Sequence, residues 1–328
     1  MSHHCASVIG RTKGWIGPPA RFIRVIVASV LALGTTVAAV AESPQDDVPE
    51  SHPLAAMLDV ARSHADHIRS AIEDYSCVLA KRERIQNELQ PYQFMQLQVR
   101  CGTATPKKDT AEESDSTDTV ARPLSVFIRY LKPRALRDRR AIYVAGLHNG
   151  KVLVRKGGPS FGYIRVEIDP DGKMAKNESN YPITDIGFDR MFDRLIEIIS
   201  ENVELDPDGL NTNVQQFKHA KVQDRVCTHY QVTHPTRHSG LAFHQANLYV
   251  DDRDRIPVRL TVYGWPETEG GDPLLLEEYT YINLELNVGL TDDDFDPSRL
   301  GDPSTDAKES VAVDASSSPP ASQASVAR

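Results

Sequence analysis

The sequence predicts an α+β protein in which one large antiparallel β-sheet is covered by two amphipathic helices. About ten segments are rich in β-branched and aromatic residues and are separated by turn residues. Several of them alternate apolar and polar residues, so one face of the sheet needs a cover. Two other segments carry apolar residues at helical spacing and can supply that cover. Without the polar terminal segments and one polar internal segment, roughly 220 residues remain, which suits a single domain.

Composition and charge narrow the class of protein. The chain has 328 residues, of which 40% are hydrophobic and 25% are charged, as in soluble globular proteins. Its formal net charge is −9. Residues 1–41 contain basic residues and no acid, so residues 42–328 carry a net charge of −13. Because a net-acidic surface repels phosphate backbones, we expect no nucleic-acid partner.

The N-terminal segment has the features of an export signal. Residues 25–40 form an apolar run of 16 residues after basic residues, shorter than the ~20 residues that cross a bilayer. Small residues at Ala39 and Ala41 predict a signal peptide over residues 1–41, cleaved between Ala41 and Glu42. An uncleaved N-terminal anchor is the alternative. Either form predicts an exported protein of the periplasm or cell envelope, with a polar lead-in over residues 42–51.

Two helices are expected. The first spans residues 53–74, and the second spans roughly residues 186–202. The apolar stripe of the first helix consists of Leu54, Leu58, Ala61, Ala65, Ile68 and Ile72. The apolar stripe of the second helix consists of Phe188, Met191, Phe192, Leu195, Ile198 and Ile199. Each helix can pack flat on the sheet or act as a lid over a groove.

A β-hairpin follows the first helix, with strands over residues 77–85 and 92–100. If its turn centres on Leu89, Cys77 faces Cys101. Directly opposed residues lie close enough for a disulfide, and an oxidising compartment favours one. We therefore predict a Cys77–Cys101 disulfide, with Cys77–Cys227 as the alternative if the register slips by one residue.

Residues 102–122 contain almost no bulky apolar side chain and predict a disordered insertion loop. Residues 299–328 predict a disordered tail for the same reason. The domain is therefore expected to span residues 52–298. The remaining predicted strands are 124–131, 141–147, 151–156, 163–168, 214–222, 225–234, 241–250, 257–265 and 275–286.

Chemistry-bearing motifs are sparse. The sequence contains no GxSxG, HExxH or Walker A string, and nothing in it calls for a cofactor or metal. A metal-dependent hydrolase is an alternative if the histidines of residues 229–244 meet at one ion. These histidines are His229, His234, His238 and His244. Glu83 could pair with Glu277 or Glu278 as acid and base, and the basic residues around it could contact phospholipid headgroups.

Several strings, in order along residues 52–297, resemble a family of exported bacterial proteins known only as a domain of unknown function. They are HPLAAMLDVA, DYSCVLAKRERI, RPLSVFIRYLKP, NYPITDIGF, RLIEII, FHQANLYVDD, IPVRLTVYGWP and LLEEYTYINLELNVGLTDDDFDP. The strings YVDDRDRIPVRLTVY and TYINLELNVGLTDDDFDP are more distantly similar to the LolA/LolB and RseB-like periplasmic lipoprotein carriers. That likeness implies a curved, open half-barrel that wraps an apolar cavity beneath helices.

The leading functional hypothesis is a non-enzymatic binding protein that holds an acyl chain, a lipoprotein or an apolar peptide between sheet and helices. The cavity candidates are Val126, Ile128, Ile164, Val166, Leu248, Val258, Leu260, Ile282 and Leu284. The lid candidates are Leu58, Ile68, Phe192 and Leu195. An envelope sensor or scaffold that binds a partner protein is a second hypothesis. Transient contact with a membrane surface is compatible with both.

Overall fold

The computed structural model describes residues 49, 51–103, 122–158, 164–238 and 240–301, and all of its helices and strands belong to one compact unit. The predicted signal peptide, its cleavage site between Ala41 and Glu42, most of the 102–122 loop and most of the C-terminal tail lie outside these residues. None of the described helices is long and apolar enough to cross a membrane.

The predicted α+β class is confirmed. Twelve strands form one sheet, every pair in it is antiparallel, and the order is β7-β6-β5-β4-β3-β1-β12-β11-β10-β9-β8, with β2 pairing only with β1. The first seven strands are β1 (Asp74–Ile85), β2 (Glu88–Leu89), β3 (Gln93–Arg100), β4 (Ser125–Lys132), β5 (Arg140–Val144), β6 (Val152–Arg155) and β7 (Arg165–Ile168). The others are β8 (Asn213–Val222), β9 (Arg225–Thr233), β10 (Gln245–Asp251), β11 (Pro257–Gly264) and β12 (Leu274–Leu286).

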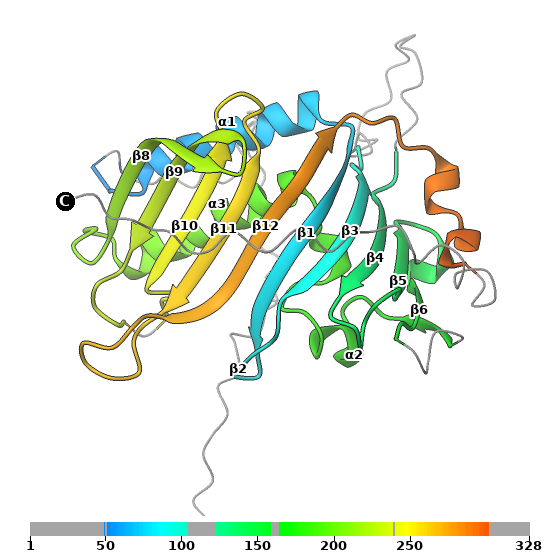
Figure 1. The fold of residues 1–328 in the computed structure, drawn as a ribbon. Helices are drawn as coiled ribbons and strands as arrows, with labels where there is room; N and C mark the ends of the chain where they lie inside the picture. Colours follow the sequence, from blue (N-terminus) through cyan, green and yellow to red (C-terminus); the bar gives the residue numbers. More distant parts are fainter. Residues whose placement is uncertain (1–48, 50, 104–121, 159–163, 239, 302–328) are drawn as a thin grey trace, which may run out of the picture. The chain divides into compact units, whose positions relative to one another are not determined.

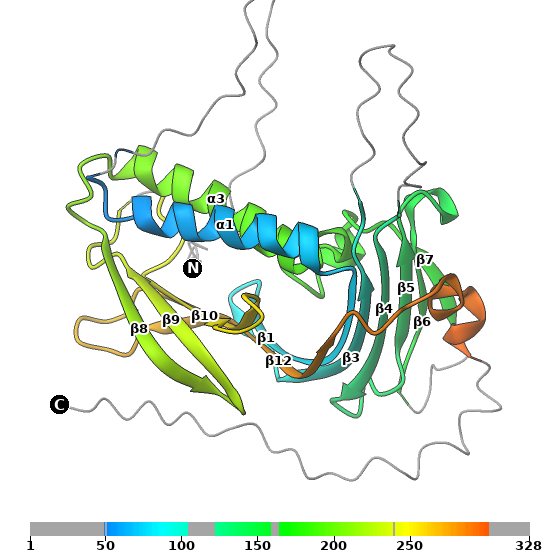
Figure 2. The same ribbon diagram turned by 90° about the horizontal axis from the view of Figure 1, so that it is seen from above.

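The sheet is curved and open. Its central strands β1 and β12 come from opposite ends of the domain sequence and lie side by side (Figure 1). Figure 2 shows the sheet bending so that β8–β9 and β4–β7 rise on either side of β1 and β12. The edge strands β7 and β8 do not pair, so the described sheet does not close into a barrel. We call the side that faces the helices the inner face.

Two long helices cover the inner face. α1 (Ala55–Ala71) and α3 (Phe188–Leu205) contact each other and run across the sheet side by side (Figure 2). Their most buried side chains join the strands in one hydrophobic core. A short helix, α2 (Lys173–Lys176), and a 3₁₀ turn, η2 (Ile183–Asp185), lead into α3. Two further 3₁₀ turns, η3 (Asp292–Phe295) and η4 (Pro297–Leu300), follow β12, and η1 (His148–Gly150) lies between β5 and β6.

The hairpin between β1 and β3 has a different register from the predicted one. Gln86 and Asn87 both have positive φ, which is typical of a tight two-residue hairpin turn. The turn therefore centres before Leu89, and Cys77 lies opposite Leu97. Arg100 is the residue opposite Asp74.

The predicted Cys77–Cys101 disulfide is accordingly wrong. Cys77, Cys101 and Cys227 are all free. Cys77 is buried in the core, and Cys101 follows the end of β3, where its backbone N–H donates to the carbonyl of Glu73. The alternative pairing of Cys77 with Cys227 is also wrong, because both thiols are free and Cys227 lies opposite Asp251 on the neighbouring strand.

Several boundaries differ from the predicted ones. The helix expected over residues 53–74 spans Ala55–Ala71, and the strand expected over residues 77–85 begins at Asp74. The strand expected over residues 241–250 begins only at Gln245. Leu241 and Phe243 are buried, as strand residues would be, but they lie in the loop before this strand. The folded domain continues past residue 298. Leu300 is buried on the face opposite the helices, where it packs with Phe127 and Ile142.

Candidate ligand-binding site

One row of paired residues crosses the inner face from the β8 edge to the centre of the sheet. The register aligns, strand by strand, Val214, Val232, Ala246, Val262, Glu277 and Glu83. Four apolar residues are thus followed by two carboxylates. We call this set the inner row. Its members share one face because directly paired residues point to the same side of a sheet.

The apolar part of this face is only half covered. Val214, Ala246 and Val262 of the inner row are partly exposed although they pack against the main core. On the next row, Leu260 is also half-buried. The facing helix α3 carries a matching stripe of half-buried residues, Met191, Leu195 and Ile198. Apolar side chains on both the sheet and the helix therefore remain accessible to solvent.

The two carboxylates at the end of the inner row are buried and directly opposed. The whole residues are 2% exposed for Glu83 and 8% for Glu277. Lys81 Nζ lies 3.0 Å from Glu83 Oε2, and the Tyr279 hydroxyl also donates to Glu83. The Tyr181 hydroxyl donates to Glu277 over 3.0 Å. We call these five residues the acidic cluster.

Three groups of the acidic cluster, Glu277, Tyr181 and Tyr279, have raised pKa values. Burial, followed by the negative charge of Glu83, raises the pKa of Glu277 to about 7, although the hydroxyl of Tyr181 opposes this rise. Burial also raises the pKa of Tyr181 and Tyr279 well above their usual value, and the two carboxylates add to that effect. Both tyrosines therefore act as neutral donors at physiological pH, whereas Glu277 titrates there.

Tyr181 covers the acidic cluster from a loop. It lies in the segment between α2 and η2, and its residue surface is 39% exposed while its hydroxyl points inward to Glu277. The same segment is anchored at Ser179, whose hydroxyl accepts from Lys81 over 2.9 Å and donates to Glu83 over 3.3 Å. The backbone N–H of Asn180 donates to Glu83 as well. Residues 179–181 thus form a polar cap on the carboxylates.

The predicted cavity and lid residues fall into two groups. Most are fully buried members of the core, namely Val126, Ile128, Leu248, Val258, Leu284, Leu58, Ile68 and Phe192. Ile164, Val166, Leu260 and Leu195 are half-buried, and the last three pack against the core. The half-buried residues remain candidates for contact with a ligand, whereas the buried ones form the wall behind them.

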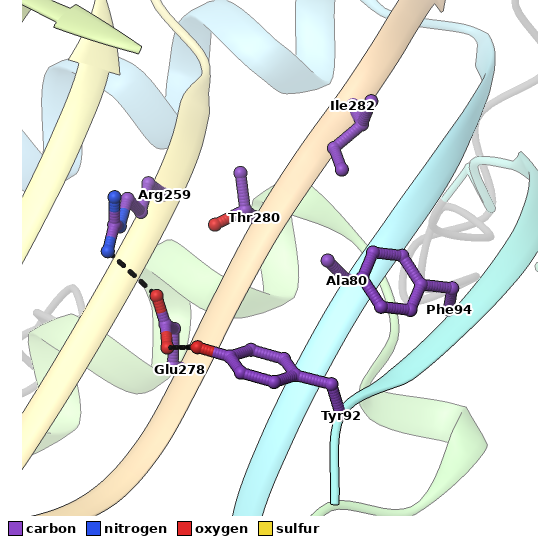
Figure 3. Close-up of a pocket in the computed structure, with 7 residues that line it drawn as sticks. All are labelled: Ala80, Tyr92, Phe94, Arg259, Glu278, Thr280 and Ile282. Atoms are coloured by element: carbon purple, nitrogen blue, oxygen red, sulfur yellow. Dashed lines mark hydrogen bonds and ion pairs between the residues drawn. The ribbon is translucent and has the colours of Figure 1, made fainter. Parts of the chain in front are cut away.

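Ile282 does not belong to this set, because it lies on the opposite, outer face. Asn283 has a positive φ at an irregularity in the β1–β12 pairing, and this extra residue reverses the alternation between Ile282 and Leu284. Ile282 lines a small outer hollow with Tyr92, Phe94 and Glu278, together with Ala80, Arg259 and Thr280 (Figure 3).

The polar side chains that line the outer hollow are hydrogen-bonded to one another. Glu278 Oε1 accepts from Arg259 over 2.7 Å, and Glu278 Oε2 accepts from Tyr92 over 2.5 Å, as the dashed lines of Figure 3 show. Arg82 lies over the Tyr92 ring. The predicted basic patch on β1 is therefore divided, with Lys81 on the inner face and Arg82 on the outer face.

The histidines of residues 229–244 do not meet at one ion site, although His244 Nδ1 lies 2.9 Å from the carbonyl oxygen of His234. His229 stacks on Tyr249 with ring centroids 4.3 Å apart, on the outer face. His234 is fully buried, and His244 lies near Trp265. His238 is exposed. Among the described residues, no group of three or more histidine, cysteine or acidic side chains is placed to hold a metal ion.

Sequence reasoning found the two carboxylates but missed their partners. The sequence left open whether Glu83 could pair with Glu277 or with Glu278, and the register places Glu277 opposite Glu83. Tyr279 follows Glu277 by two residues on the same face, a spacing that alternation could have revealed. Tyr181 comes from an irregular loop, where no periodic signal marks its direction.

A family profile identifies the chain. The profile described as "Protein of unknown function (DUF1571)" matches residues 72–304, which is most of the chain. The chain belongs to this family. The resemblance to a domain of unknown function is thereby confirmed for this DUF1571 protein. No curated protein matches its sequence.

Solved structures similar to this DUF1571 protein are distant in sequence. One is a putative outer membrane lipoprotein-sorting protein domain from Vibrio parahaemolyticus, at 11% identity and a TM-score of 0.33, covering 74% of this chain and 97% of the other. A LolA superfamily protein from Nitrosomonas europaea has 10% identity and a TM-score of 0.29, covering 73% and 98%. MucB in complex with MucA(peri) has 12% identity and a TM-score of 0.39, covering 73% and 58%. At this level, the function must be argued from the chain's own residues.

Proposed function

We propose that this chain is an exported, non-enzymatic binding protein of the periplasm or cell envelope. It holds an apolar ligand, such as an acyl chain, a lipoprotein segment or an apolar peptide, between the inner face of the sheet and α3. The export part of the proposal is supported by the basic and apolar N-terminal sequence with small residues before Glu42.

Half-buried apolar side chains on two facing surfaces support the binding part of the proposal. Leu260 and Val262 on β11 are partly exposed on the inner face, and so are Leu195 and Ile198 on α3. Apolar surface that remains in water inside a curved sheet is stabilised by about 25 cal/mol for each Å² that a ligand covers. A long apolar chain therefore gains free energy by lying between these surfaces.

Uptake of an apolar chain, dodecanol, by delipidated protein tests the proposal. Ala246→Trp places a large ring in the inner row, so we expect it to weaken binding of dodecanol by about tenfold, equivalent to about 1.4 kcal/mol. Gln245→Trp is the matched control, because Gln245 is the neighbouring residue on the outer face and lies opposite Tyr263. Isothermal titration calorimetry measures both affinities.

The outcomes separate binding from folding defects. Val262→Phe replaces Ala246→Trp if the latter fails to fold, because it adds less volume at the adjoining position of the inner row. The proposal is contradicted if the wild-type protein takes up no dodecanol or other apolar ligand. A partner protein retained stoichiometrically without lipid would favour the sensor or scaffold hypothesis instead.

A further inference from the structure

The inner row joins an apolar path to a negative end. Neighbouring strands lie about 4.8 Å apart, so four strand spacings place Val214 roughly 19 Å from Glu277. Val262 is the direct neighbour of Glu277 on this path. A ligand that lay along the row with its apolar part over Val214, Ala246 and Val262 would bring its polar end to the acidic cluster.

The charges of the acidic cluster do not balance. Its two carboxylates share a single cation, Lys81, and that cation lies on Glu83. The donors to Glu277 among the described residues are neutral, namely the Tyr181 hydroxyl at 3.0 Å, the Tyr279 hydroxyl at 3.5 Å and the Asn180 side chain. A buried carboxylate is stabilised best by a hydrogen bond from a cation. Burial of a carboxylate without such a cation is costly, because the carboxylate loses its hydration and gains no opposite charge. Among the described residues, Glu277 therefore has no ion pair like the one between Lys81 and Glu83.

The neutral partner of Glu277 can be exchanged. Tyr181 reaches Glu277 from the irregular segment before η2, and it is 39% exposed. It closes the cluster through one hydrogen bond to Glu277 and one from its backbone N–H to Ser179 Oγ at 3.4 Å. Such a residue can move aside at far lower cost than a side chain packed in the core.

We propose that the ligand is an amphiphile with a protonated primary amine, which Glu277 binds in place of the Tyr181 hydroxyl while the apolar part lies along the inner row. This inference rests on the proposed function and specifies the class of ligand. The ammonium donates to Glu277 and completes the charge balance of the acidic cluster. A fatty acid would instead bring a third carboxylate against Glu83 and Glu277.

Dodecylamine, dodecanol, lauric acid and dodecyltrimethylammonium are the probes, each used below its micelle concentration in isothermal titration calorimetry at pH 8. A hydrogen bond to a charged group contributes about 1.5–3 kcal/mol, so dodecylamine should bind about ten- to hundredfold more tightly than dodecanol. Dodecyltrimethylammonium keeps the charge but cannot donate a hydrogen bond, so it should bind more weakly than dodecylamine.

Glu277→Gln should remove the preference for dodecylamine over dodecanol. Glu278→Gln is the matched control, since Glu278 is the next residue on β12, also accepts from a tyrosine hydroxyl and lies on the outer face. It should retain the preference. Circular dichroism and thermal unfolding at the same pH establish that both variants are folded.

The pH dependence of binding provides a readout that a purely structural role would not change. The groups that face Glu277 are Glu83 and Lys81 from β1, Tyr279 from β12 and Tyr181 from the loop, with Arg194 of α3 beside Tyr181. Because Glu277 loses its proton near pH 7, dodecylamine should bind more tightly at pH 8 than at pH 6 in the wild-type protein and in Glu278→Gln, but not in Glu277→Gln.

Each outcome decides one question. Equal affinity for dodecylamine and dodecanol, or an unchanged preference in Glu277→Gln, overturns the amine inference and leaves the proposed function intact. Tighter binding of lauric acid than of dodecylamine also overturns it. If none of the four probes binds the wild-type protein, both the inference and the proposed function fail.

Discussion

The stability of the protein should depend on pH through Glu277. Its carboxyl group has a pKa of about 7 in the folded protein, compared with 4.5 for an unperturbed glutamate, because it is buried beside Glu83. The folded state therefore binds a proton more readily than the unfolded state between these pH values. This stabilisation is fully present below pH 4.5 and is lost as the pH rises through about 7.

The size of the effect follows from the same two values. The interval from 4.5 to about 7 corresponds to about 3 kcal/mol of unfolding free energy, since one pH unit corresponds to about 1.4 kcal/mol. This is an upper value, because relaxation of the protein and penetration of water reduce the cost of a buried charge. Glu277→Gln is uncharged at every pH and should abolish this part of the slope.

Urea unfolding at a series of pH values from 4.5 to 8 measures the effect. Relative to Glu277→Gln, the wild-type protein should lose about 3 kcal/mol across this range. Glu278→Gln serves as the control and should follow the wild-type slope, since its carboxylate lies on the outer face. Parallel curves for the wild-type protein and Glu277→Gln would refute the reasoning.

Three further predictions concern the core and the cysteines. Phe192→Ala should lower the unfolding free energy by about 3–5 kcal/mol, because Phe192 is fully buried between the helices and the sheet; a loss below 1 kcal/mol in urea unfolding would contradict this. Tyr75→Phe should leave stability unchanged or raise it by about 1 kcal/mol, since the buried Tyr75 hydroxyl has no hydrogen-bond partner among the described residues; a clear loss in thermal unfolding would show a hidden partner. Burial raises the pKa of the Cys101 thiol to about 12 and that of the Cys77 thiol further, so maleimide should label both only after unfolding, and rapid labelling of the native protein would be inconsistent with this packing.

Periodic segments made most of the fold predictable. The alternation on β3 and β11 and the helical stripe of α3 depend only on which face is buried, so their positions followed from local pattern. The placement of α1 and α3 on the sheet also followed, because each apolar stripe needs a cover. Their contact with each other was not predicted. The central pairing of β1 with β12 is a long-range contact, and local pattern contains no signal for it.

Errors arose where one residue changes the alternation. The hairpin turn at Gln86 and Asn87 lacks the glycine that usually marks such turns, so its centre was misplaced and the cysteines were wrongly paired. The extra residue at Asn283 similarly moved Ile282 to the outer face. A one-residue shift exchanges the two faces of a strand, so register errors of this kind have large consequences.

The polar part of the candidate site could be predicted only in part. Glu83 and Glu277 lie on strands whose register brings them together, and their residue types suggested a pair. The contribution of Tyr181 depends on how an irregular loop folds back onto the sheet, and neither composition nor periodicity determines that.

Native mass spectrometry of the protein purified from its own envelope tests the central claim most directly. The account predicts a bound molecule with a long apolar chain, lost when the inner row is blocked by Ala246→Trp and retained in Gln245→Trp. The account would be contradicted if the wild-type protein were detected only at the mass of its polypeptide chain and bound no apolar ligand after incubation.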